Sequence, residues 1–188
     1  MAMLNSPARQ FLKTLPDHHE PLKAILMISA HWEASQLAVS HARELETIHD
    51  FYGFPPEFYN IHYPAQGNPA LAERIAGLIT AANLGDVASV ARGLDHGAWL
   101  PLMLGYPEAQ IPITQLSLRS GGGPDWYFRL GASLRPLRNE GILVLCSGAL
   151  THNLREMDRQ AQPGDTAQWA EEFASWITKN AHCARTSD

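Results

Sequence analysis

The sequence predicts an α/β fold: a single domain with a central, mostly parallel or mixed sheet that is flanked by helices. Two short apolar runs, residues 24–28 and 142–146, are bounded by small or charged residues, as is typical of strands buried on both faces of a parallel sheet. Segments with helical spacing of apolar residues lie between and around these runs. The chain has 188 residues, 45% of them hydrophobic, which is enough for one sizeable core. We therefore expect one domain over residues 1–188.

Four helices are predicted in chain order from caps and apolar spacing. Ser6 and Pro7 open a helix that reaches about residue 15, because serine caps helices and proline suits their first position. Asn68 and Pro69 open the next one, over residues 69–79. Apolar spacing predicts two more, over residues 126–137, where Pro136 limits the end, and over residues 169–177.

Three further strands and an ordered loop complete the predicted architecture. The strands fall on residues 36–41, 87–90 and 111–118. The loop, residues 48–65, is rich in aromatic rings and prolines, which fix a shape and build apolar walls able to hold a flat ligand. It can equally be a rigid cover over a hydrophobic surface.

Charge and cysteine usage exclude several classes of protein. Fourteen Lys and Arg against nineteen Asp and Glu give a net charge of −5, without a basic run, so no nucleic-acid partner is expected. No apolar run approaches the roughly 20 residues that span a bilayer, so we expect no membrane association and a cytoplasmic location. Cys146 and Cys183 form no disulfide or metal framework, which fits a reducing compartment, and Cys146 is expected in the core.

Histidines follow both buried strands. His31 comes three residues after Ile28, and His152 follows the run that ends at Cys146. Ligands of open α/β sheets lie beyond the carboxyl ends of the strands. We therefore predict that the two strands are parallel neighbours and that the two imidazoles face one cleft, where they can bind a metal or act as a base. Alternatively, His31 only hydrogen-bonds a neighbouring loop.

Other histidines leave two interpretations open. His96 stands between Asp95, which could orient an imidazole, and Gly97, which permits close approach, so it suits acid/base catalysis. The same residues also suit a turn at the start of a helix. The adjacent His18 and His19 could bind a metal, although side chains in such loops usually face solvent.

Four segments resemble a known family in the same order: SAHW at residues 29–32, TIHDFYGFP at 47–55, LDHGAW at 94–99 and THNLR at 151–155. Together they are similar to the class III extradiol ring-cleavage dioxygenases, in the branch that resembles DOPA 4,5-dioxygenase. The similarity extends from about Asn5 to Trp176. It implies an α/β domain that holds a non-haem Fe(II), or Zn(II) in its place, and opens the ring of a catechol with O₂.

The resemblance also implies roles for individual residues. His31 is a metal ligand, and His152 is the acid/base histidine that also approaches the metal. His96 lines the substrate pocket and takes part in catalysis. Substrate contacts are further expected from His49, Phe51, Tyr52 and Asn153. These residue types suit the chemistry, because imidazole and carboxylate ligands leave positions on Fe(II) open and a nearby imidazole can accept and return a catechol proton.

Two metal ligands of the family have no counterpart in this sequence. The family carries a histidine in a Gly-His-Gly segment before the region where the similarity begins, and a late ligand that the segment around His182 does not match. We expect a chain truncated at both ends, substitute ligands such as His18, His19 or His182, or loss of the metal. Binding of Fe(II) and turnover of catechols are accordingly expected to be weak.

Two other functions stay open from the sequence. The chain can be a non-catalytic remnant of this fold that binds aromatics or a partner subunit. A zinc-dependent hydrolase is a third interpretation, since clusters of His and Asp also hold zinc. Assembly into a homo-oligomer is compatible with all three.

Overall fold

The computed structural model describes residues 6–156 and 165–183, which fall into two compact units. The first unit is Met1–Gly148 and the second is Ala149–Asp188, and each is described by itself. The first unit has an α/β architecture, which confirms the predicted fold class. That the whole chain forms one domain stays a prediction.

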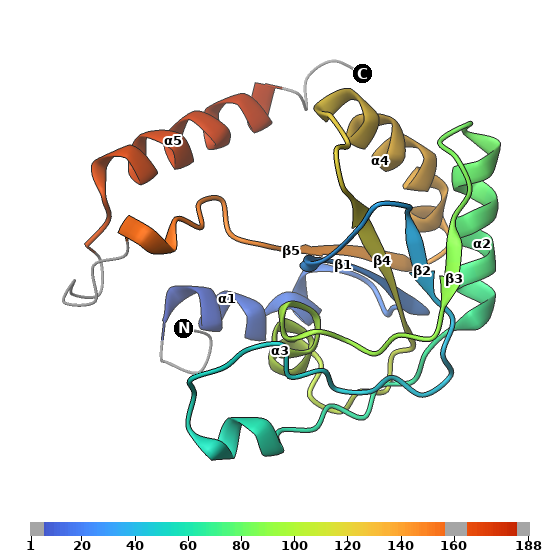
Figure 1. Cartoon of the computed structure of the whole chain (residues 1–188), viewed down its shortest axis with the longest axis horizontal. Coiled ribbons are helices and arrows are strands. Elements are labelled where there is room, and N and C mark those ends of the chain that lie inside the picture. The colour runs from blue at the N-terminus through green and yellow to red at the C-terminus, as the bar shows by residue number, and fades with distance from the viewer. Residues whose placement is uncertain (1–5, 157–164, 184–188) are drawn as a thin grey trace. The chain divides into compact units, whose positions relative to one another are not determined.

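A five-stranded mixed sheet forms the centre of the first unit (Figure 1). Its strands are β1 (Ala24–Ala34), β2 (Ala38–Ser40), β3 (Ala88–Val90), β4 (Ile113–Arg119) and β5 (Ile142–Ser147), in the order β3-β2-β4-β1-β5. β1 runs parallel to β4 and β5, whereas β2 runs parallel to β3 and antiparallel to β4. The register pairs Ile28 with Cys146. The two apolar runs are therefore parallel neighbours, as predicted.

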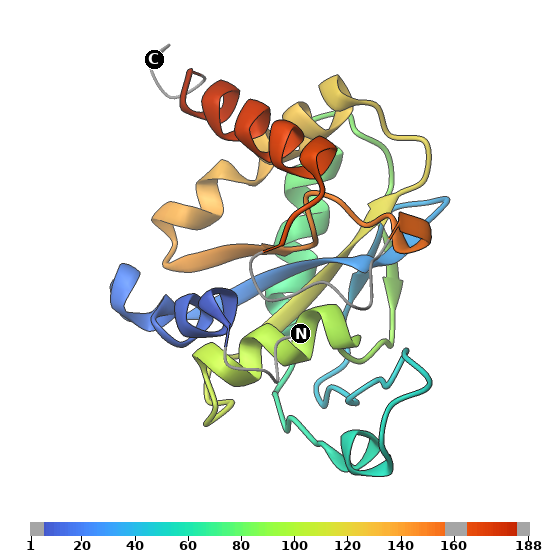
Figure 2. The same cartoon turned by 90° about the vertical axis from the view of Figure 1, so that its left-hand side faces the viewer.

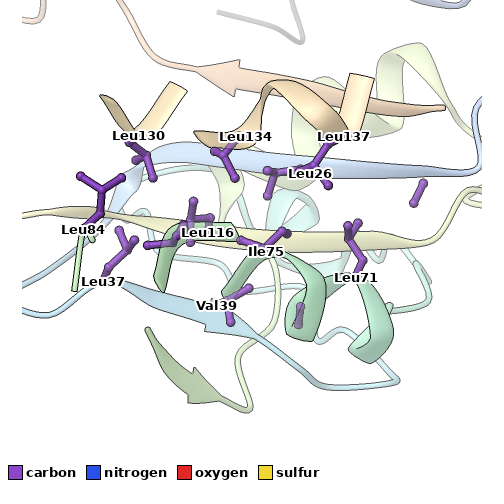
Figure 3. Packing of buried hydrophobic residues seen from close by; sticks show 13 residues of the cluster. Leu26, Leu37, Val39, Leu71, Ile75, Leu84, Leu116, Leu130, Leu134 and Leu137 are labelled. Atoms are coloured by element: carbon purple, nitrogen blue, oxygen red, sulfur yellow. The ribbon is translucent and has the colours of Figure 1, made fainter. Parts of the chain in front are cut away.

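One face of the sheet is covered by α2 (Pro69–Ala81) and α4 (Pro124–Asn139). Figure 3 shows leucines of α4 and Ile75 of α2 packing on Leu26 and Leu116 of the sheet. Burying each such side chain contributes about 1.5–3 kcal/mol. Asn68 caps α2 as predicted, because its Oδ1 accepts from the Leu71 N–H at 3.0 Å. The sequence predicts that Pro136 limits the end of this helix, but α4 continues to Asn139. The proline removes one N–H donor without stopping the last turn.

The opposite face is covered by α3 (His96–Gly105), with α1 (Pro7–Lys13) packed against α3 (Figure 2). Trp99 and Leu102 of α3 are fully buried against Ile25 of β1. Ser6 caps α1, since its hydroxyl accepts from the Arg9 N–H at 3.2 Å. Two 3₁₀ helices, η1 (Leu15–His18) and η2 (Pro56–Asn60), lie in the connections.

The second unit contains a short 3₁₀ helix, η3 (Leu154–Glu156), and α5 (Gln168–Cys183). The helix predicted over residues 169–177 is thus confirmed and is longer at both ends. Within this unit Trp169 and Trp176 are partly exposed, and Phe173 stacks on Trp176 with ring centroids 6.0 Å apart. Among residues 6–156 and 165–183, every helix falls short of the length or the hydrophobicity of a membrane span.

β5 differs from the expectation of a strand buried on both faces. Residues 142–145 are half-buried and Cys146 is exposed, so the expected core position of this cysteine is wrong. The physical reason is the strand order: β5 is the last strand, and only β1 pairs with it among the described residues. An apolar sequence therefore marks a strand of this sheet without fixing its place in the sheet.

A buried tyrosine pair gives the first unit a dependence on alkaline pH. The Tyr63 hydroxyl donates to the Tyr106 carbonyl at 2.9 Å, and burial, with Tyr106 adding to the effect, raises the pKa of Tyr63 to about 12. An unfolded tyrosine titrates near pH 10, so the stability that the neutral phenol contributes is complete below about pH 10 and is lost as the pH rises to about 12. We expect urea denaturation to show a steeper loss of stability across this window in the wild type than in Tyr63→Phe. Tyr52→Phe, at a 91% exposed position, should keep the wild-type slope.

Candidate metal centre

His31 lies in an irregular part of β1. Pairing with β4 is regular up to Ile28, opposite Leu116, and resumes at Glu33, opposite Leu118. The four residues between them therefore face a single residue of β4, which is a bulge in the strand. The bulge releases the chain from the regular ladder, and the His31 side chain is 38% exposed.

A second segment reaches the same place through a backbone bridge. Thr47 and Leu94 form an isolated parallel bridge, in which the Ile48 N–H donates to the Leu94 carbonyl at 2.8 Å and the Leu94 N–H donates to the Glu46 carbonyl at 2.8 Å. The close contact between these two backbone segments requires a glycine at position 93, because a Cβ there would collide with the Glu46 carbonyl. The bridge brings the segment after Thr47 to the start of α3. Figure 1 shows the loop that begins there, residues 48–65, beside that helix.

His31, Asp50 and His96 converge where these segments meet. The Asp50 Oδ2 lies 3.4 Å from the His31 Nδ1, and the Asp50 Oδ1 lies 2.8 Å from the His96 Nδ1. One nitrogen or oxygen atom of each residue can be chosen so that all three lie within 4.8 Å of one another. Ligands about 2 Å from one ion lie within about 4 Å of each other, so the spacing of these three atoms is close to what a single ion requires.

The donor types fit a divalent transition metal. Two imidazoles and one carboxylate are the set that holds non-haem Fe(II) with positions left open, and zinc accepts the same ligands. Burial raises the pKa of Asp50, but hydrogen bonds from the backbone N–H and the imidazole of His96 outweigh that effect and lower the pKa below its ordinary value. The carboxylate is therefore charged at neutral pH, as a metal ligand must be.

An aromatic wall stands beside the His96 imidazole. The Phe51 ring meets it edge-on with centroids 5.4 Å apart and lies 6.3 Å from the Trp99 ring. His49 lies 5.8 Å from Phe51, and its Nε2 is 2.9 Å from the Ile61 carbonyl. The loop thus presents ring surfaces next to the candidate metal ligands, which suits a flat aromatic ligand.

Comparison with known proteins identifies the family. Residues 7–186 match the family described as the catalytic LigB subunit of aromatic ring-opening dioxygenase. The chain belongs to this family. It is 42% identical over 176 residues to a 4,5-DOPA dioxygenase extradiol of Beta vulgaris, covering 92% of the chain and 65% of that protein. A protein of the same name from Escherichia coli K12 is 40% identical, with 84% of the chain and 58% of that protein covered.

The relationship extends to a solved structure. The crystal structure of the uncharacterized protein JW3007 from Escherichia coli K12 superposes with a TM-score of 0.76 at 33% sequence identity. The aligned region covers 92% of this chain and 64% of that protein. The chain thus spans about 58 to 65% of the length of these relatives.

The second unit of this LigB-family chain carries His152 and Asn153 on an open groove of about 760 Å³. The groove is lined within that unit by Leu150, Thr151, His152, Asn153, Glu156, Trp169 and Phe173. Both predicted site residues are exposed, and aromatic rings of α5 lie near them. That His152 faces the same cleft as His31, and that it binds the metal or transfers protons, stays a prediction.

Sequence reasoning brought His31, His96, His49 and Phe51 to one site but missed Asp50. It considered Asp95 as the partner of the His96 imidazole, whereas the structure assigns that contact to Asp50 and buries Asp95 as the cap of α3. The available signal was the acid directly after His49 in the matched segment. Tyr52 is 91% exposed, so its predicted contact with substrate also stays untested.

Proposed function

We propose that this chain forms part of an extradiol dioxygenase that opens the ring of a catechol-type substrate with O₂. In this proposal His31, Asp50 and His96 hold a catalytic Fe(II), and Zn(II) can take its place. The observation that carries the proposal is the convergence of two imidazoles and one carboxylate within 4.8 Å, next to an aromatic wall, in a member of the LigB family. When bound, Fe(II) would supply open coordination positions at which a catechol and O₂ meet.

The protein's own residues supply binding and proton transfer. The Phe51 ring beside His96 gives a flat substrate an apolar surface, while the half-buried His49 offers a polar edge. A catechol must lose its hydroxyl protons as it binds a cation, and the unligated nitrogen of an imidazole is the natural acceptor at neutral pH. We propose this role for His152 and the orientation of the substrate for Asn153, as the resemblance of the THNLR segment implies.

Metal binding by the 188-residue chain tests the proposed ligands. Anaerobic calorimetric titration with Fe(II), and with Zn(II), is expected to give one site per chain. His31→Ala, Asp50→Asn and His96→Ala should each weaken binding by at least about 10-fold, since each removes a ligand and even the loss of an outer hydrogen bond costs 10 to 100-fold. His41→Ala is the matched control, because this exposed imidazole lies 3.0 Å from the Ser89 hydroxyl outside the cluster. Unchanged affinity in all three ligand variants would refute the assignment.

Activity is tested separately with catechols, including DOPA, the substrate named in the relatives from Beta vulgaris and Escherichia coli. The expected result is O₂ consumption together with a coloured ring-opened product, in the iron-loaded wild type and in His41→Ala. Binding of metal and catechol without O₂ consumption would instead identify a non-catalytic member of the family.

A further inference from the structure

Beneath the His31 and His96 pair lies a carboxylate with no exposed surface, Asp95. Its Oδ1 accepts from the Ser29 hydroxyl at 2.6 Å and from the Ala98 N–H at 3.2 Å. Its Oδ2 accepts from the Gln115 Nε2 at 2.6 Å and lies 3.7 Å from an Arg92 nitrogen. Both oxygens are thus held by groups from three different segments.

Capping α3 does not by itself require this arrangement. An N-cap needs one side-chain oxygen, which serine, threonine or asparagine supplies equally well without a charge. Burying a carboxylate costs free energy unless its oxygens are fully hydrogen-bonded. The second oxygen and its partners therefore indicate a task in addition to the cap.

The Ser29 hydroxyl links Asp95 to the first metal ligand. It donates to Asp95 and accepts from the His31 backbone N–H at 3.1 Å. Because His31 lies in the bulge, the regular pairing of β1 with β4 is interrupted there, and this side-chain link takes over in fixing the backbone. A Cβ at Gly97 would lie 2.8 Å from the His31 Cδ2 and 3.2 Å from the Asp95 Oδ1, so the imidazole packs directly over the capped turn.

The same carboxylate also fixes the second ligand. His96 is the first residue of α3, and Asp95 holds that first turn through the Ala98 N–H. We propose that Asp95 is a positioning residue: through Ser29 on one side and the cap of α3 on the other, it holds His31 and His96 at the spacing that a metal ion needs. This inference rests on the proposed metal site.

Four variants separate this role from a general effect on folding. Ser29→Ala breaks the link to His31, and Asp95→Ala breaks both links. Asp95→Asn is the conservative variant, because the new amide keeps one oxygen for Ser29, while the Gln115 Oε1, which has no partner among the described residues, can turn to accept from the new N–H₂. Ser117→Ala is the matched control: it removes another fully buried hydroxyl, opposite the bulge, which accepts from the Ala38 N–H at 2.9 Å and so belongs to neither of the two links from Asp95.

Two measurements are made on each variant of the full 188-residue chain. Titration with Co(II) should show affinity lowered about 10 to 100-fold in Ser29→Ala and Asp95→Ala, less than about 10-fold in Asp95→Asn, and unchanged in Ser117→Ala. In the metal-free chain, the imidazole NMR signals of His31 and His96 should shift and broaden in the first two variants and stay close to wild type in the other two.

The outcomes separate the inference from the function on which it rests. If Ser29→Ala binds Co(II) as tightly as Ser117→Ala, or if its imidazole signals match those of the wild type, the positioning role is wrong. If the wild type binds no Co(II), the proposed metal site fails, and the imidazole signals alone then decide the inference. Changed signals in Ser29→Ala, restored in Asp95→Asn relative to Asp95→Ala, would support it in that case too.

Discussion

Gly97→Ala is expected to weaken metal binding at the candidate centre by about 100-fold, at the upper end of what lost supporting contacts cost a metal site. The added Cβ would collide with the Ser29 hydroxyl and lie 2.8 Å from the His31 Cδ2, closer than unbonded carbons approach. Both groups must move, and the imidazole then leaves the position it shares with Asp50 and His96. Overpacking of this kind also destabilises a fold by about 1–3 kcal/mol. Calorimetric titration with Zn(II) measures the first effect, and urea denaturation measures the second.

Gly77→Ala is the matched control for this substitution. Gly77 also lies in a helix, but a Cβ there meets nothing within 4 Å. Alanine should stabilise α2 by roughly 0.5–1 kcal/mol and leave metal affinity unchanged. If Gly97→Ala bound Zn(II) as tightly as Gly77→Ala does, the close approach at Gly97 would have no part in shaping the site.

Trp99→Ala should give the largest loss of stability, about 3–5 kcal/mol. Trp99 is fully buried between α3 and the sheet, and its Nε1 donates to the Ile48 carbonyl at 2.9 Å. The substitution leaves a cavity and also removes the hydrogen bond to the Ile48 carbonyl, two residues before Asp50. Urea denaturation followed by circular dichroism provides the measurement.

Two further variants separate the loss of buried surface at Trp99 from the loss of its N–H donor and from the effect of removing an exposed ring. Trp99→Phe keeps most of the buried surface but loses the N–H donor, so it should cost less than Trp99→Ala while still loosening the segment that carries Asp50. Phe128→Ala removes a 76% exposed ring and should change stability by no more than about 0.5 kcal/mol. A Trp99→Ala loss below that of Phe128→Ala would mean that Trp99 does not anchor this layer.

Local patterns in the sequence predicted most of the fold. Caps at Ser6 and Asn68 and the apolar run before His31 are signals confined to a few consecutive residues, and the structure confirms the elements that they predict. The parallel pairing of β1 with β5 followed from one general rule about buried strands. The exposure of Cys146 did not, because it depends on which strands flank β5, which its own residues do not encode.

The candidate metal centre was only partly predictable for a related reason. Asp50 reaches His96 because residues 47 and 94 pair, and a contact across such a sequence distance leaves no periodic signal in one chain. The proposed positioning role of Asp95 could not be predicted for another reason. An acid before a helix is typical of an ordinary cap, and only its complete burial and its hydrogen bonds to Ser29 and Gln115 indicate a further role.

The bulge in β1 allows the segment around His31 to change in length without shifting the pairing with β4 that resumes at Glu33. In a regular strand, inserting or deleting one residue moves every following side chain to the other face. Here the pairing stops after Ile28 and starts again at Glu33, so a residue gained or lost between them is absorbed before the ladder resumes. Insertions and deletions at this point are therefore tolerated by the pairing of β1 with β4 and are constrained instead by the buried Ser29 and Trp32 side chains and by the position of His31.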